Sequence, residues 1–131
     1  MNRIVLDSNI LISAYVFGGK PKAILSLIIS EKVQAITSGI LISEFLDILR
    51  KKFGVSQAEI LEIEEEIKDT FEIVFPSKTI RIVRDEDDNR VLEAAVEGEC
   101  QYIITGDKDL LDLGKYNKIK ILTAEQFLSK F

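Results

Sequence analysis

Short apolar runs alternate along this chain with longer stretches in which apolar residues recur every three or four positions. The runs predict strands, and the stretches between them predict helices. Strands are expected at Arg3–Leu6, Val33–Thr37, Ile80–Val83, Tyr102–Thr105 and Ile119–Leu122. Helices are expected at about 9–16, 21–30, 39–52, 56–72, 87–97, 107–112 and 124–130. This alternation predicts a single three-layer α/β/α domain over residues 1–131, with a central, mostly parallel sheet of about five strands.

Two element boundaries are marked by particular residues. Ser56 and Glu59 have the spacing of a capping box, which predicts that a helix opens at Gln57 and runs to Phe71. Pro76 ends the segment that follows, because proline cannot continue a helix or a central strand.

Composition fits this picture of one soluble domain. The 131 residues are 47% hydrophobic and 30% charged, which suits a globular chain with a core of ordinary size. No apolar run approaches the roughly 20 residues that span a bilayer, and Met1–Arg3 leads directly into a strand without a cleavable signal. The single cysteine, Cys100, leaves no internal disulfide and favours a reducing compartment. We therefore expect no membrane association and a cytoplasmic location.

The absence of histidine narrows the chemistry. Ser-His-Asp and Cys-His nucleophilic sites are excluded, and zinc is disfavoured with only one cysteine. No glycine-rich dinucleotide motif or P-loop is present. The formal net charge of −5 argues against a nucleic-acid partner. That argument weakens if cations bind, because two divalent ions would bring the net charge to about −1. Acid-based metal chemistry remains.

Four acids converge on one edge of the predicted sheet: Asp7, Glu44, Asp88 and Asp107. Asp7 and Asp107 follow strands, while Glu44 and Asp88 lie early in helices that begin at the same edge. Ligands of open α/β sheets bind beyond the carboxyl ends of the strands. Crowded carboxylates are costly unless a cation neutralises them. The four acids therefore predict a divalent metal site.

Glu44 is the most informative of these acids. Its neighbours at helical spacing include Ile40, Leu41 and Ile48, so it lies on a largely apolar face. A carboxylate on such a face is expensive unless it is paired or bound to a metal. Asp47, in contrast, is surrounded by polar residues and is predicted to be an exposed, ion-paired residue.

The other three acids also have an ordinary explanation as helix caps. Asp7 and Asp107 each precede a predicted helical turn, and Asp85 or Asp87 would cap the helix that contains Asp88. Within the acidic run, Asp87 and Asp88 could exchange roles. Asp88 is preferred because helical spacing places it over Leu92 and Ala95, on the buried side.

Basic residues near the predicted edge are candidates for binding substrate. Four of them flank it: Lys20, Lys22, Arg90 and Lys108. The run Arg50-Lys51-Lys52 ends a helix, where cations complement the helix dipole, and phosphate binding by this run is the less favoured alternative.

Four segments of the chain, in order, resemble the motifs of PIN-domain ribonucleases. They are Val5–Ala14 with Phe17–Gly19, Thr37–Glu44, Asp85–Ala95 and Thr105–Leu111. The likeness runs essentially end to end. It is greatest to the branch described as toxin components of toxin–antitoxin pairs.

The resemblance implies a fold, an activity and a set of site residues. The family's metal-binding acids fall on Asp7, Glu44, Asp88 and Asp107, and Asp109 matches an acid that is sometimes an additional ligand. Asn9 and Thr105 match polar positions that support the site. The implied activity is Mg²⁺- or Mn²⁺-dependent hydrolysis of single-stranded RNA by an endoribonuclease. A cognate antitoxin and self-association, as a dimer, are the implied partners.

Other functions remain open at this point. The same acids would serve an RNA-processing enzyme or a DNA or flap nuclease, and a non-catalytic RNA-binding protein could share the fold. A phospho-accepting receiver domain also places acids at a strand edge. Such a domain needs an acidic pair beside its first strand and a lysine after its last. This chain has Ser8-Asn9 and Thr123-Ala124 at those places.

Overall fold

The computed structural model describes all residues from 1 to 131. Six strands form one sheet. The strands are β1 (Arg3–Leu6), β2 (Gln34–Ser38), β3 (Glu72–Val74), β4 (Tyr102–Ile104), β5 (Lys115–Tyr116) and β6 (Ile119–Leu122). Their order is β3-β2-β1-β4-β6-β5, and all neighbours are parallel except β5 and β6. Because β1 has β2 on one side and β4 on the other, the chain reverses direction across the sheet beside β1.

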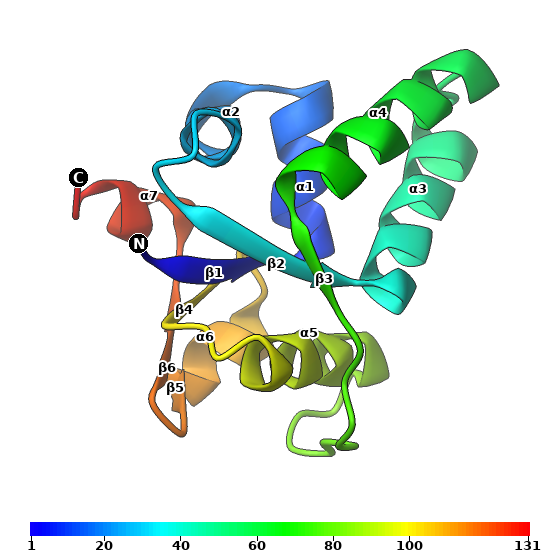
Figure 1. Ribbon diagram of the computed structural model, residues 1–131. Coiled ribbons are helices and arrows are strands. Elements are labelled where there is room, and N and C mark those ends of the chain that lie inside the picture. Colours follow the sequence, from blue (N-terminus) through cyan, green and yellow to red (C-terminus); the bar gives the residue numbers. More distant parts are fainter.

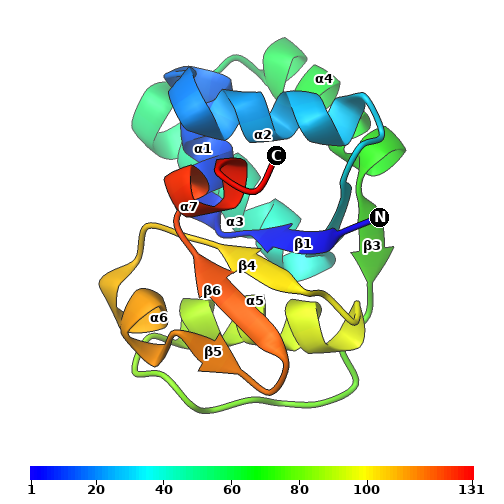
Figure 2. The ribbon, with the colours of Figure 1, turned by 90° about the vertical axis from the view of Figure 1, so that its left-hand side faces the viewer.

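Helices cover both faces of the sheet, as Figures 1 and 2 show. Seven helices are present: α1 (Ser8–Val16), α2 (Gly19–Ile29), α3 (Gly39–Phe53), α4 (Gln57–Thr70), α5 (Glu86–Glu97), α6 (Lys108–Leu113) and α7 (Ala124–Leu128). The first four helices and α7 lie on one face, while α5 and α6 lie on the other. The predicted three-layer α/β architecture with a mostly parallel sheet is confirmed.

The central strand β1 divides the core into two parts. Ile4 and Leu6 pack with the helices of the larger layer, and Val5 packs with α5 and α6. All three side chains are almost completely buried. Successive strand residues point to opposite faces, so a strand covered on both sides is apolar at every position. Strand β4 behaves in the same way, with Ile103 and Ile104 in different parts.

The ends of α3 and α4 follow from their local sequences. Ser38 caps α3 by accepting from the backbone N–H of Leu41, and Gly54 ends it in the left-handed conformation that glycine adopts without strain. Ser56 caps α4 at the predicted residue by accepting from the N–H of Glu59. The Glu59 carboxylate contacts the Ser56 hydroxyl, so only one half of the capping box forms.

The predicted strand at Ile80–Val83 is wrong. This segment joins no sheet, and side chains of α5 bind its backbone instead. The N–H of Ile80 donates to Glu93 Oε2 at 2.9 Å, and Asn89 binds the N–H and C=O of Val83 at 3.0 and 2.9 Å. With its backbone groups already bound, the apolar segment has no need of a strand partner.

Two short strands were not predicted. The sequence assigned Glu72 to the preceding helix, but that helix ends at Thr70 and Phe71 turns to an extended backbone, which starts the edge strand β3. Strand β5 pairs antiparallel with β6 across a tight turn that contains Asn117 at φ 53°. Asparagine tolerates this left-handed conformation better than most residues, and it favours such hairpin turns.

No single helix is both long enough and apolar enough to cross a membrane. Helices α1 and α2 meet that standard only when they are taken together, and they are bent by 95° relative to one another.

Candidate metal centre

Asp7 and Asp107 are joined through one buried hydroxyl. Asp7 follows β1, and its backbone N–H bonds to the carbonyl of Ile104 at the end of β4. Thr105 is completely buried, donates from Oγ1 to Asp7 Oδ2 at 2.7 Å and accepts from the N–H of Asp107 at 2.9 Å. The ends of the two central strands are therefore held together, with a carboxylate on each.

Asp7 and Asp107 are helix N-caps and also belong to the group of acids at the sheet edge. Asp7 is the N-cap of α1 and accepts from the N–H of Ser8 at 2.7 Å. Asp107 is the N-cap of α6 and accepts from the N–H of Leu110 at 3.0 Å. Each backbone donor fixes one carboxylate oxygen, and the positive ends of both helices lie at the acids. Capping thus orients the carboxylates.

Asp88 brings a third carboxylate to the same place. It is only 6% exposed, and its Oδ2 is buried without a hydrogen-bond partner. Carboxylate oxygens of Asp88, Asp107 and Asp109 all lie within 4.8 Å of one another. We call Asp7, Asp88, Asp107 and Asp109 the acid centre. A buried carboxylate oxygen without a donor is rare in proteins, and a cation would satisfy it.

Burial and the crowding of the acids together raise the pKa of Asp88 and of Asp7. Burial raises the pKa of Asp88 to about 8, and the neighbouring Asp107 and Asp7 carboxylates push it in the same direction. Burial also raises the pKa of Asp7, although the hydrogen bonds from Thr105 and Ser8 oppose the shift. A carboxylic acid held neutral beside other acids is typical of a functional site.

Glu44 lies on α3 at the border of the acid centre. It is half-buried, and burial followed by the charges of Asp87 and Asp7 raises its pKa, against a contact with the Ser8 side chain. Glu44 is not part of the three-acid group around Asp88. It lines a neighbouring cavity of about 380 Å³ together with Asp87 and Lys51. The Asp7 carboxylate contributes to the raised pKa of Glu44, so Glu44 lies within reach of the charge of the acid centre.

The structure distinguishes Asp87 from Asp88. Asp85 is the N-cap of α5 and accepts from the N–H of Asp87 at 2.9 Å. Asp87 is exposed, whereas Asp88 is buried and belongs to the three-acid group. Leu92, one helical turn after Asp88, is completely buried, as the helical spacing predicted.

The remaining predicted site residues have less direct links to the acids. Asn9 is exposed and makes no hydrogen bond to them. Lys20 pairs with Glu125 of α7, Lys108 pairs with Asp112, and Lys22 is exposed without an ion pair. Arg90 is held by Glu86, by Glu93 and by the carbonyl of Ile80, so much of its guanidinium is already bound. None of these basic residues forms an ion pair with a residue of the acid centre.

Two residues at the site were missed by the sequence analysis. Ser8 is buried, and it contacts both Asp7 and Glu44. Arg84 places Nη2 at 2.9 and 3.1 Å from the two carboxylate oxygens of Asp109. Ser8 follows the cap residue Asp7, and this position alone does not indicate a contact with Glu44. Arg84 and Asp109 are far apart in the sequence, so no local pattern indicates their contact.

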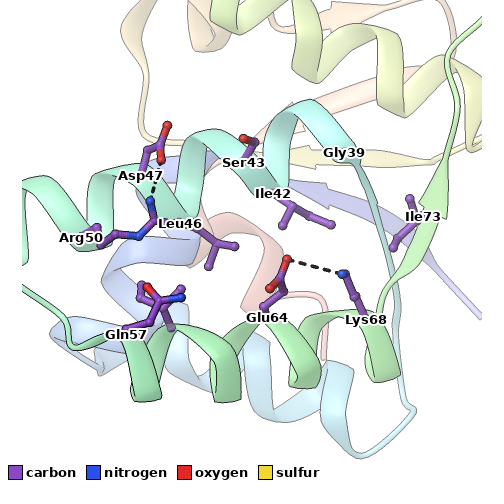
Figure 3. Close-up of a pocket in the computed structure, with 11 residues that line it drawn as sticks. Gly39, Ile42, Ser43, Leu46, Asp47, Arg50, Gln57, Glu64, Lys68 and Ile73 are labelled. Carbon is purple, nitrogen blue, oxygen red and sulfur yellow. Dashed lines mark hydrogen bonds and ion pairs between the residues drawn. The ribbon is translucent and has the colours of Figure 1, made fainter.

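A separate cavity of about 350 Å³ lies between α3 and α4 (Figure 3). Asp47 lines it and pairs with Arg50 at 3.2 Å, and Glu64 pairs with Lys68 at 3.4 Å. The ion pair confirms the prediction for Asp47. None of the acid centre lines this cavity, so the cavity is separate from the candidate metal centre.

The acid centre has the ligand chemistry of a hard divalent cation. Its available donors are carboxylate oxygens, which suit Mg²⁺, Mn²⁺ and Ca²⁺ rather than softer ions. The unpartnered Oδ2 of Asp88 provides an oxygen for such an ion to bind. The hydroxyl and backbone donors around Asp7 and Asp107 would act as the outer contacts that orient metal ligands.

Comparison with known proteins places the chain in a family. A family model described as "PIN domain" matches residues 3–109. The chain belongs to the PIN domain family. The matched range includes Glu44 and the whole acid centre. PIN domains are generally nucleases and usually use divalent metals. The chain is also 33% identical, over 142 aligned residues, to an uncharacterized protein of Methanocaldococcus jannaschii, covering 98% of this chain and 91% of that protein.

The buried hydroxyl of Thr105 gives a first prediction for this PIN domain. Thr105→Val keeps the shape but removes the contacts to Asp7 and Asp107, and we expect it to weaken Mn²⁺ binding by roughly 10- to 100-fold. We also expect the free energy of unfolding to fall by about 1–3 kcal/mol, because the buried polar groups of Asp7 and Asp107 lose a hydrogen-bond partner. Calorimetric Mn²⁺ titration and urea unfolding measure the two effects. Thr105→Ser keeps the hydroxyl and is the control; equal losses in both variants would contradict the prediction.

Proposed function

We propose that this PIN domain is a divalent-metal-dependent endoribonuclease that hydrolyses phosphodiester bonds of single-stranded RNA. The observation that carries the proposal is the unpartnered, buried carboxylate oxygen of Asp88, close to Asp107 and Asp109. Asp7 joins this group through Thr105. Acids packed in this way are costly for folding, which is the expected feature of a site selected for binding a cation.

The proposed roles of the residues follow from their contacts. Asp7, Asp88 and Asp107 would hold one or two Mg²⁺ or Mn²⁺ ions, with Asp109 as an additional ligand and Glu44 at the border. Thr105, with the N–H groups of Ser8 and Leu110, would keep the Asp7 and Asp107 carboxylates oriented. When bound, the cation would supply Lewis-acid activation of water and of the phosphate. No protein nucleophile is required, which agrees with the absence of histidine.

The products provide a chemical signature for this proposal. Attack by water on phosphorus with departure of the 3′ oxygen leaves a 5′-phosphate and a 3′-hydroxyl. The RNA 2′-hydroxyl takes no part, so no 2′,3′-cyclic phosphate should form. End-group analysis therefore separates the proposed activity from a contaminating ribonuclease that uses the 2′-hydroxyl.

The direct test uses labelled single-stranded RNA with the purified protein in Mn²⁺, Mg²⁺ or EDTA. Cleavage is expected with either cation and not in EDTA. Asp7→Asn should lower the rate at least about 100-fold, because losing a ligand exceeds the roughly 10- to 100-fold cost of losing an orienting residue. Asp69→Asn, an exposed acid on α4, is the matched control. Equal cleavage by Asp7→Asn, or by wild type in EDTA, would end the proposal.

The same assay separates the alternative substrates. Single-stranded DNA and a flap structure are included beside RNA, and faster cleavage of either would replace RNA as the substrate. Binding of RNA without cleavage under any cation would indicate a non-catalytic PIN protein. In each case the acid centre is the same, and only the substrate assignment changes.

We further propose that the enzyme acts in the cytoplasm as the toxin component of a toxin–antitoxin pair. The support is the resemblance of its four motifs to that branch of the family. Expression of wild type should arrest growth, Asp7→Asn should not, and a small protein encoded beside it should restore growth. Without such a neighbour, RNA processing becomes the favoured role. Sedimentation of the purified chain tests the expected dimer.

A further inference from the structure

Arg84 is the only cationic residue that forms an ion pair with the acid centre. Its Nη2 donates to both carboxylate oxygens of Asp109, at 2.9 and 3.1 Å. Every other ion pair of the chain involves acids outside the centre. Arg84 immediately precedes the N-cap of α5, and Asp109 lies in the first turn of α6. The pair therefore connects the segment before α5 to α6 at the acid centre.

Most of the Arg84 guanidinium is still available. The side chain is 87% exposed, and that of Asp109 is 32% exposed. Only Nη2 bonds to Asp109, so Nε and Nη1 have no partner in the protein. The guanidinium carries five N–H donors in a planar fork, whose geometry matches the oxygens of a phosphate. An ion pair this exposed is weak and can be exchanged for another partner.

The backbone on both sides of Arg84 is held in place. Asn89 binds the N–H and the C=O of Val83, and the side chain of Asp85 caps α5. A fixed backbone with a free, charged end is a favourable arrangement for positioning a ligand, because only side-chain freedom is lost on binding. Arg81, three residues earlier, is exposed but has no such acidic partner.

We propose that Arg84 is a phosphate-positioning residue of the RNA site. In the free protein it holds Asp109; when a cation and RNA occupy the acid centre, it contacts the RNA backbone beside the bond to be cleaved. This inference rests on the proposed function. Arg84 and the cation compete for Asp109, so a cation that takes Asp109 frees the guanidinium for phosphate.

Two measurements test the proposal in the full chain, with Arg84→Ala, Arg84→Lys and Arg81→Ala. The first is calorimetric titration with Mn²⁺ and no RNA. Removing a competing cation should make Arg84→Ala bind Mn²⁺ about two- to five-fold more tightly, the range expected for losing an exposed ion pair. Arg81→Ala should match wild type. Weaker Mn²⁺ binding in Arg84→Ala would mean that Arg84 only supports the site, and would overturn the proposal.

The second measurement is binding of a short single-stranded RNA in Ca²⁺, with the RNA checked for integrity on a gel. Arg84→Ala should raise the Kd roughly ten-fold and reduce the slope of log K against log salt by about 0.7, the value for one phosphate contact on a single strand. Arg84→Lys should fall between Arg84→Ala and wild type, since lysine keeps the charge but lacks the fork.

The outcomes separate this inference from the proposed function. If wild type cleaves RNA but Arg84→Ala and Arg81→Ala share one Kd and one salt slope, Arg84 has no positioning role. If wild type neither binds nor cleaves RNA, the proposed function and the phosphate contact both fail. The Mn²⁺ titration then still decides whether Arg84 and a cation compete for Asp109.

Discussion

Asp88→Asn is expected to abolish RNA cleavage and, at the same time, to stabilise the metal-free protein. Cleavage should fall at least about 1,000-fold, because the variant loses a buried carboxylate oxygen that has no hydrogen-bond partner and is free to bind a cation. Without metal, asparagine avoids placing an ionisable group in a buried, acidic setting. The melting temperature of Asp88→Asn should therefore exceed that of wild type in EDTA.

The pH dependence of this stabilisation has a definite sign. The pKa of Asp88 rises from 3.8 to about 8 on folding, so the folded protein binds a proton that the unfolded chain releases between these values. The contribution of Asp88 to the stability of the metal-free wild type must then fall as pH rises across that interval. The advantage of Asp88→Asn should grow from about pH 4 to about pH 8 and remain constant above. Thermal unfolding at several pH values in EDTA measures it.

Asp87→Asn is the matched control for this experiment. It removes the same charge from the adjacent, exposed residue. We expect its stability and its cleavage rate to stay near those of wild type. The stability result does not depend on the proposed function. A loss of stability in Asp88→Asn at pH 8 would show that the buried carboxylate stabilises the fold, contrary to the burial and crowding described above.

The second large effect is expected from the cation itself. Mn²⁺ at 100 times its Kd should stabilise the protein by about 2.7 kcal/mol. Because Asp88 must lose its proton to bind a cation, the apparent affinity should rise roughly tenfold per pH unit until the pH reaches the pKa of Asp88. Thermal unfolding with increasing MnCl₂ at pH 6, 7 and 8 gives this dependence, and EDTA should reverse it.

Proton release checks the same prediction by another route. Titrations in buffers of different ionisation enthalpy should detect a proton leaving the protein as Mn²⁺ binds near pH 7. Asp88→Asn should bind Mn²⁺ more weakly and release no proton from this position. An affinity that does not change with pH in wild type would mean that Asp88 does not lose a proton when the ion binds.

Local sequence was sufficient for the elements whose residues agree with their surroundings. The runs Ile4–Leu6 and Tyr102–Ile104 are apolar at every position and form the central strands. Ser56 marks the start of α4, as its spacing from Glu59 predicted. In contrast, Ile80–Val83 has the composition of a strand but is bound by Asn89 and Glu93 of α5. Such long-range side-chain contacts leave no trace in a local hydrophobic pattern.

The acids illustrate the same division. Placing Asp7 and Asp107 at one edge required only that both follow parallel strands, which is a property of the order of elements along the chain. Their link through Thr105 depends on two strands 98 residues apart meeting side by side. Likewise, Asp87 and Asp88 have the same chemistry, and only their positions on α5 relative to the sheet make one exposed and the other buried.

By itself the sequence determined the α/β class, the central strands, the principal helix caps and the edge at which the acids gather, since these follow from short-range periodicity and the order of elements. Helical spacing already favoured Asp88, and the tertiary structure alone decided the border position of Glu44 and the pairing of Arg84 with Asp109. Each of these depends on the distance between side chains on different elements, and packing sets that distance.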